Sequence, residues 1–118
     1  NACDIVISSH IKKFSGASCP VTEGVSIGKM IIGSNYGSVG NLINENHLGL
    51  TFEVENPESL SNTILKALSE NFSPDEKYKE YQKNVSRKKF IERYKNLYEE
   101  VDMLSKSKYN PLSVIRYP

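Results

Sequence analysis

Three short apolar runs stand out along the chain, and each is bounded by glycine or polar residues. They fall at residues 4–9, 29–33 and 48–52 and are built mainly from Ile, Val, Leu, Met and Phe. The first two are continuous rather than alternating, which is typical of parallel strands that are covered on both faces. The pattern therefore predicts a short parallel sheet of three strands.

Helical periodicity follows the third strand. Residues 56–58 form a helix start, with an Asn cap, a proline at the first position and an acid in the first turn. Apolar residues at helical spacing continue from there to about residue 70. A further helix is predicted from residue 73, and a last one after Ser86, which caps it. The last helix carries an apolar stripe, made of Phe90, Tyr94, Leu97, Tyr98, Val101 and Leu104. We predict that the stripe packs into the core, with a membrane-surface helix and a partner-binding helix as the alternatives.

Residues 14–28 combine a small-residue loop with a short helix. Ser18 predicts an N-cap whose hydroxyl accepts from a free N–H group, and Pro20 fits the first helical positions. Gly28 ends the helix, because glycine readily adopts a left-handed backbone. One side of this helix is small and apolar and should lie close against the sheet; it consists of Val21, Gly24, Val25 and Gly28. Glu23 lies on the opposite side of this helix.

The loops after the strands carry the candidate chemistry, because open α/β sheets bind ligands at the C-terminal ends of their strands. His10, Lys12 and Lys13 follow the first strand; contact with a phosphate is one interpretation, and exposed loop side chains are the favoured one. Residues 34–40 form a second, glycine-rich loop. Glu23 is suited to accept hydrogen bonds from the hydroxyl pair of a sugar or ribose, and N–H groups at a helix start favour phosphate.

A family resemblance rests on the order and spacing of several segments. They are T-E-G-V-S-I-G-K-M-I-I-G-S-N-Y-G-S-V-G-N-L-I, then Gly49-Leu50-Thr51-Phe52, then Asn56-Pro57-Glu58-Ser59-Leu60. Together they resemble the C-terminal half of the nucleotide-sugar-dependent, retaining glycosyltransferases of the GT-B fold (group 1, or family 4), over about residues 2–101. The resemblance implies an α/β, partial Rossmann-like domain: a three-layer sandwich with a short parallel sheet, C-terminal helices and the donor site at the strand ends.

The site residues that the resemblance implies lie between residues 15 and 23. In the family, two glutamates eight positions apart form the donor signature, and the second typically holds the nucleotide ribose. Glu23 matches the second glutamate, whereas Ser15 stands in place of the first. Backbone N–H groups would face the sugar and diphosphate from Gly16, Ala17, Ser18 and Cys19. Pro20 has no N–H to offer at the next position, so we expect weakened donor binding.

Composition and charge argue against several classes of function. The chain has 118 residues and a formal net charge of +1, which argues against a generic nucleic-acid binder. Cys3 and Cys19 lack metal-ligand spacing and are expected to be free thiols in a reducing cytoplasm. No apolar run approaches the twenty or so residues of a membrane span. We predict one domain over residues 1–104 and an extended C-terminal arm over residues 105–118.

The resemblance also implies substrates and partners. The expected function is donor binding in an enzyme of polysaccharide or glycoconjugate biosynthesis, which transfers a hexosyl group from a nucleotide sugar to a glycan or lipid-linked acceptor. The fold requires no metal or other cofactor. The acceptor site and any general base belong to an N-terminal domain of the same protein, so the catalytic residues are unknown and this chain alone should be inactive. The expected location is the cytoplasm, with peripheral contact at the inner face of the membrane.

Three further expectations concern the isolated chain and other functions. A three-strand half-sheet has an exposed edge, so we predict that the isolated chain self-associates or is marginally stable. A non-catalytic GT-B homologue or partner subunit is one alternative function, in which Ser15 and Pro20 mark a lost donor site. A GT-B nucleotide-sugar epimerase is the other.

Overall fold

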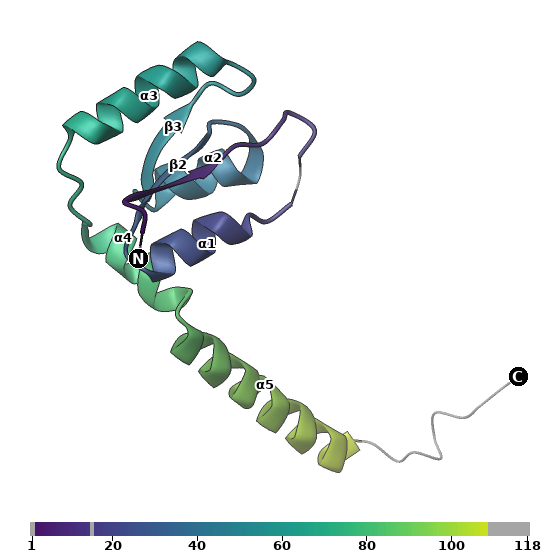
Figure 1. The fold of residues 1–118 in the computed structure, drawn as a ribbon. Coiled ribbons are helices and arrows are strands. Elements are labelled where there is room, and N and C mark those ends of the chain that lie inside the picture. The colour runs from purple at the N-terminus through teal and green to yellow at the C-terminus, as the bar shows by residue number, and fades with distance from the viewer. Residues whose placement is uncertain (1, 15, 109–118) are drawn as a thin grey trace, which may run out of the picture. The chain divides into compact units, whose positions relative to one another are not determined.

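The computed structural model describes residues 2–14 and 16–108, and Figure 1 shows its ribbon. Contacts within the chain divide it into two units, Asn1–Ser86 and Arg87–Pro118. In the described residues, the first unit holds the sheet with four helices and the second holds one long helix. The division by contacts falls after Ser86, and the domain over residues 1–104 stays a prediction.

The sheet consists of three parallel strands, as predicted. They are β1 (Ile5–Ser8), β2 (Met30–Ser34) and β3 (Gly49–Phe52), in the spatial order β1-β2-β3. Ile5 pairs with Met30 across the first pair of strands, and Ile31 pairs with Gly49 across the second. Every residue of β2 is buried, which explains the continuous apolar run in its sequence.

Helices cover both faces of this sheet and complete a three-layer α/β arrangement (Figure 1). The helices α1 (Cys19–Ser26), α2 (Gly37–Glu45) and α4 (Glu76–Asn84) contribute to the core on one face. Helix α3 (Pro57–Ser69) packs on the other face. The predicted fold class is confirmed: the first unit is a partial Rossmann-like domain with an open parallel sheet.

Two clusters of buried side chains form the core, one on each face. The larger contains Val21, Val25, Ile31, Val39, Ile43, Leu48 and Tyr78. The smaller contains Met30, Ile32, Phe52 and Ala67. Gly24 brings α1 close to the sheet, because a Cβ atom there would lie 2.7 Å from Cδ1 of Ile31. Gly28 has φ +76° after the end of α1, as the helix stop predicted.

Helix α2 begins inside the segment that was predicted to be a glycine-rich loop. Residues 34–40 were predicted to be a loop, but the helix begins at Gly37. Val39 and Ile43, one turn apart, are buried in the larger cluster and hold the first turn against the sheet. A Cβ atom on Gly40 would lie 2.6 Å from the carbonyl carbon of Asn35. This glycine therefore permits close packing within a helix, rather than marking a loop.

Helix α4 is fixed to the rest of the first unit at its N-terminus. Asp75 caps the helix by accepting a hydrogen bond from the backbone N–H of Tyr78 at 3.0 Å. The other carboxylate oxygen of Asp75 lies 2.5 Å from Nδ1 of His47, which follows α2 and has φ +53°. One exposed carboxylate therefore joins the start of α4 to the segment between α2 and β3.

We expect Asp75→Asn to remove a pH-dependent part of the stability. The backbone N–H of Tyr78, and then the side chain of His47, hold the pKa of Asp75 below its ordinary value of 3.8. A carboxyl group whose pKa is lower in the folded state stabilises the fold above its unfolded pKa, and this contribution is lost as the pH falls through the folded pKa. Asn is an equally good N-cap, so the variant should melt below wild type at neutral pH and converge with it in acid.

Thermal melts between about pH 3 and pH 7 measure this difference. Asp4→Asn, the same chemical change at an exposed residue, is the control. A gap in melting temperature between Asp75→Asn and wild type that stays constant over the whole range contradicts the prediction.

The second unit is described by itself. Helix α5 (Arg87–Lys108) continues four residues past the predicted domain end, so residues 105–108 are helical and not part of an extended arm. The remainder of that predicted arm, residues 109–118, lies outside the described residues. Taken by itself, this helix carries the apolar stripe with Phe90 57% exposed and Leu97 and Val101 53% exposed. The packing of the stripe into the core stays a prediction. Within residues 2–14 and 16–108, each helix is too short or too polar to cross a membrane.

Candidate functional site

The C-terminal ends of the three strands define one edge of the first unit. Parallel strands bring their C-terminal ends to the same side, so the loops at residues 9–18, 35–36 and 53–56 all follow this edge. Two strands end in a serine, Ser8 in β1 and Ser34 in β2, and both serines are buried. Buried hydroxyl groups require hydrogen-bond partners, and these partners lie in the loops.

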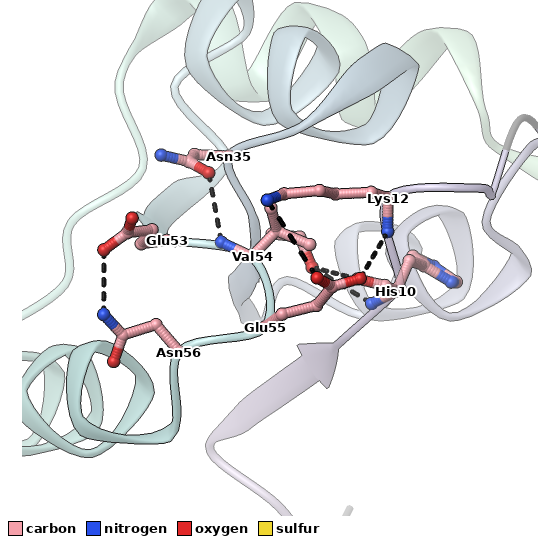
Figure 2. A network of polar contacts seen from close by, with 8 residues as sticks. His10, Lys12, Asn35, Glu53, Val54, Glu55 and Asn56 are labelled. Carbon is pink, nitrogen blue, oxygen red and sulfur yellow. Dashed lines mark hydrogen bonds and ion pairs between the residues drawn. The ribbon is translucent and has the colours of Figure 1, made fainter.

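Hydrogen bonds join the three loops to one another. Ser34 Oγ accepts from the backbone N–H of His10 at 3.0 Å and donates to the carbonyl of the same residue at 3.1 Å. Asn35 Oδ1 accepts from the backbone N–H of Val54 at 3.3 Å (Figure 2). Each of these side chains follows or ends β2 and reaches the loop after a neighbouring strand.

A further contact closes the connection between the first and third loops. Glu55 Oε1 accepts from the backbone N–H of Lys12 at 3.2 Å, and the other oxygen of the same carboxylate lies 4.0 Å from the Lys12 ammonium (Figure 2). Both side chains are at least half exposed, so the ion pair itself contributes little. The two contacts between Glu55 and Lys12 instead position the tip of the first loop beside the loop that follows β3. We call the three joined loops the loop edge.

His10 and two serines form a small polar cluster at the base of the loop edge. Ser8 Oγ lies 2.7 Å from Ser18 Oγ and 2.9 Å from Nε2 of His10, and the imidazole lies 3.3 Å from Ser18 Oγ. The imidazole also stacks on Phe14, with ring centroids 3.8 Å apart and planes 8° from parallel. The first loop is therefore held at its middle as well as at its tip.

This cluster corrects the role predicted for Ser18. Ser18 occupies the N-cap position of α1, but its side chain makes no capping hydrogen bond, because the hydroxyl is turned toward Ser8 and His10. Pro20 has no N–H, and the first turn of α1 contains no acidic residue. Among the described residues, no side chain caps the N–H groups of Cys19 and Val21, and these groups add to the positive end of the helix dipole. Such a helix start attracts an anion.

Three open cavities lie along the loop edge. The first has a volume of about 330 Å³ and is lined by Gly16, Ala17, Ser18, Thr22, Ser38, Val39, Leu42 and Tyr81. The second, of about 510 Å³, is lined by Lys12, Lys13, Phe14, Tyr36, Gly37 and Ser38. The third, of about 280 Å³, is lined by Ser9, His10, Ile11, Phe52, Glu55, Asn56, Pro57 and Leu60. Three of the predicted site residues, Gly16, Ala17 and Ser18, therefore line one cavity together.

The remaining predicted residues are placed differently. Glu23 is exposed on α1, on the side away from the buried Gly24, and its carboxylate has no hydrogen-bond or ion-pair partner among the described residues. Cys19 is an exposed free thiol in the first turn of α1. Neither residue lines the cavity beside Ser18. Ser15 lies outside the described residues. Over residues 2–14 and 16–108, there is no group of three or more His, Cys, Asp or Glu side chains that could hold a metal ion.

Comparison with models of known protein families shows to which family this chain belongs. The family model for "Glycosyl transferases group 1" matches residues 1–88, three quarters of the chain. The chain belongs to the group 1 glycosyltransferases. The match covers the whole sheet unit and reaches the first two residues of α5. No curated protein and no solved structure matches the chain. The activity class of this glycosyltransferase domain is thus glycosyl transfer, and the loop edge is its candidate site.

Several residues of the loop edge were missed by sequence reasoning. Ser8, Ser34 and Asn35 each end or follow an apolar run, and a polar residue at that place is the signal that could have identified them. Glu55 has φ +62°, which is uncommon for a residue with a side chain, and nothing in its local sequence indicates this conformation. The sequence alone favours exposed loop positions for His10, Lys12 and Lys13. The structure gives the first two specific partners.

Proposed function

We propose that this chain is the donor-binding part of a retaining glycosyltransferase that takes a hexosyl group from a nucleotide sugar and passes it to a glycan or lipid-linked acceptor. Membership of the group 1 family supports glycosyl transfer. The observation that carries the choice of the loop edge as donor site is the helix start of α1, where the Ser18 hydroxyl is withdrawn and no acid is present. A nucleotide diphosphate has the charge that suits this place.

Each element of the loop edge has a role in this proposal. The backbone N–H groups of residues 16–19 face the sugar and diphosphate, and the helix dipole of α1 stabilises the negative charge that develops on the departing diphosphate. The Glu23 carboxylate accepts hydrogen bonds from the ribose hydroxyls. Lys12 and Lys13 add positive charge beside the neighbouring cavity. These assignments require no metal ion.

The acceptor and the remaining chemistry belong to the rest of the enzyme in this proposal. An N-terminal domain of the same protein supplies the acceptor site and any general base, and the reaction takes place in the cytoplasm or at the inner face of the membrane. Residues 1–118 alone are then inactive. Transfer of sugar catalysed by these residues alone would contradict this part of the proposal.

We expect Glu23→Gln to weaken binding of the nucleotide sugar by roughly 10- to 150-fold. The substitution keeps the shape of the side chain but removes charge-assisted hydrogen bonds, which are worth about 1.5–3 kcal/mol. Isothermal titration of the full-length protein with a panel of nucleotide sugars measures the loss, and the tightest ligand identifies the donor. Glu45→Gln is the matched control, because Glu45 ends α2 and is exposed at the opposite edge of the sheet. Equal affinities for wild type and Glu23→Gln would remove Glu23 from the site.

One observation favours a second candidate, a non-catalytic homologue or partner subunit. Pro20 lies in the first turn of α1 and deprives the proposed diphosphate site of an N–H group. If the site is degenerate, wild type should bind no nucleotide sugar, and Ser15→Glu should not create affinity. A gain in affinity on Ser15→Glu would instead show that the missing family carboxylate alone limits a donor site that is otherwise intact.

A further inference from the structure

Lys12 lines one cavity of the loop edge, and its partner Glu55 lines another. The cavity at Lys12 has a volume of about 510 Å³, and the cavity at Glu55 has a volume of about 280 Å³. The dashed lines in Figure 2 run from the Glu55 carboxylate to both the backbone nitrogen and the ammonium of Lys12. The positive charge of Lys12 is therefore shared between a carboxylate and the larger cavity.

The larger cavity has the chemistry of a site for a phosphate group. Of the described residues that line it, Lys12 and Lys13 are basic and none is acidic. The ammonium of Lys13 has no hydrogen-bond or ion-pair partner among residues 2–14 and 16–108. Ser38 lines both this cavity and the one beside the start of α1, and its hydroxyl donates to the carbonyl of Gly16 at 3.3 Å. A diphosphate at the start of α1 is thus next to the cavity that the two lysines line.

The ion pair between Lys12 and Glu55 is weak enough to be exchanged for a stronger one. The two charged groups are 4.0 Å apart and both side chains are at least half exposed, so water screens their attraction. A diphosphate carries more charge than one carboxylate and accepts charge-assisted hydrogen bonds from an ammonium. The long stem of lysine lets the ammonium turn, while the backbone N–H of Lys12 stays bonded to Glu55 Oε1 at 3.2 Å.

The backbone of Glu55 supports a functional interpretation of this contact. Its φ angle of +62° is uncommon for a residue with a side chain, and such conformations cluster at ligand sites. The residues on either side are fixed, because the N–H of Val54 donates to Asn35 at 3.3 Å and Asn56 caps α3. The fold itself therefore holds the Glu55 carboxylate beside Lys12, without depending on the attraction between their charges.

We propose, on the basis of the diphosphate site assigned above to the start of α1, that Glu55 is a positioning residue for Lys12. In the free protein, the Glu55 carboxylate keeps the Lys12 ammonium away from the diphosphate site. A bound diphosphate replaces this carboxylate as the partner of the ammonium, and Lys12 then joins Lys13 at the larger cavity. Glu55 thereby lowers the affinity of the loop edge for diphosphates, since its contact with Lys12 has to be broken first.

Isothermal titration of the full-length protein with inorganic pyrophosphate, and with uridine, guanosine and adenosine diphosphates, tests this exchange. Glu55→Gln keeps an acceptor for the backbone N–H of Lys12 but removes the charge, so it should raise the affinity roughly 3- to 5-fold. Glu53→Gln is the matched control, because the Glu53 carboxylate lies in the same loop and accepts from Asn56 at 2.8 Å. It should change the affinity by less than about a factor of two. A gain in affinity cannot come from partial unfolding.

A second pair of variants separates the release of Lys12 from the simple removal of a negative charge. Lys12→Met keeps the unbranched stem and removes the ammonium, so it should lower the affinity roughly 3- to 10-fold. In that background, Glu55→Gln should change the affinity by less than about a factor of two, because there is no ammonium to release. An equal gain in both backgrounds would overturn the proposal, since Glu55 would then act only as a negative charge near the ligand.

Two further results would overturn the proposal in different ways. If wild type binds a diphosphate but Glu55→Gln binds it no more tightly than Glu53→Gln does, the donor site stands and the exchange is wrong. If neither wild type nor Glu55→Gln binds pyrophosphate or any of the three nucleotides, both the donor site and the exchange are wrong.

Discussion

Tyr78→Ala should lower the free energy of unfolding of the sheet unit by about 3–5 kcal/mol, the range observed when a large buried aromatic side chain is truncated. Tyr78 is the largest fully buried side chain of the described residues, with an exposed fraction of 0%. It belongs to α4 but packs in the larger core cluster, and its ring meets Phe72 edge to face at 5.4 Å. Its removal would leave a cavity where α4 joins the sheet.

The hydroxyl of Tyr78 contributes to the free energy of unfolding separately from the packing of the ring. This hydroxyl donates a 2.7 Å hydrogen bond to the carbonyl of Lys29, the residue before β2. Tyr78→Phe keeps the ring and leaves that carbonyl without this donor, so it should cost about 1–3 kcal/mol. Burial raises the pKa of Tyr78 above 10. The folded state therefore keeps the proton longer than the unfolded state, and the stabilisation that Tyr78 provides declines as the pH rises above 10.

Urea denaturation followed by circular dichroism at neutral pH distinguishes the two Tyr78 variants. Tyr36→Ala is the control, because Tyr36 is 47% exposed and its loss should change stability by less than about 0.5 kcal/mol. Nearly equal losses for Tyr78→Ala and Tyr78→Phe would mean that the hydrogen bond, and not the packing of the ring, stabilises α4. A loss below about 1 kcal/mol for Tyr78→Ala would show that α4 is not integral to the core.

Gly49→Ala should destabilise the sheet unit by about 3–5 kcal/mol, through overpacking and backbone strain together. A Cβ atom on Gly49 would lie 1.9 Å from the carbonyl oxygen of Ile31, the residue with which Gly49 pairs in the sheet. The φ angle of Gly49 is +157°. The contact is with backbone, so no side chain can rotate to relieve it, and β3 would have to separate from β2.

Gly37→Ala provides a matched comparison for Gly49→Ala. Gly37 also has a positive φ, +64°, but the nearest atom to a Cβ there is the carbonyl oxygen of Phe14 at 3.8 Å. We expect a loss of about 1 kcal/mol from backbone strain alone. Thermal and urea unfolding of both variants measure the difference. Similar losses for the two would show that the sheet register adjusts around residue 49.

The strands could be predicted from sequence because their signal is local. The three apolar runs correspond to β1, β2 and β3 within about one residue, and residues 56–58 start α3 as expected, with the Asn56 side chain accepting from Ser59. Helix α2 was underestimated because Gly37 and Gly40 have low helix propensity. Tertiary packing of Val39 and Ile43 outweighs this preference.

The candidate site could be predicted only at the level of segments. The topology of a parallel sheet places the loops at one edge, so the location of residues 16–18 beside a cavity followed from the order of strands. The direction of the Ser18 hydroxyl could not be predicted in this way. Ser8 and His10 compete with the N–H groups of the helix for a hydrogen bond to this hydroxyl, and the positions of Ser8 and His10 depend on the folded loop. The partner of Glu55 is Lys12, 43 residues away, and no local pattern records such a contact.

The order of the strands also bears on how the sheet unit folds. Each strand pairs with the strand next to it in the chain, and a single helix spans each connection. Each pair of strands is separated in sequence by one crossover only. The loop that closes when two strands pair is therefore shorter, and its entropic penalty smaller, than for strands further apart in the chain. Each crossover still separates paired residues by 25 positions between Ile5 and Met30 and by 18 between Ile31 and Gly49, so these parallel pairings should form more slowly than the pairing of a hairpin.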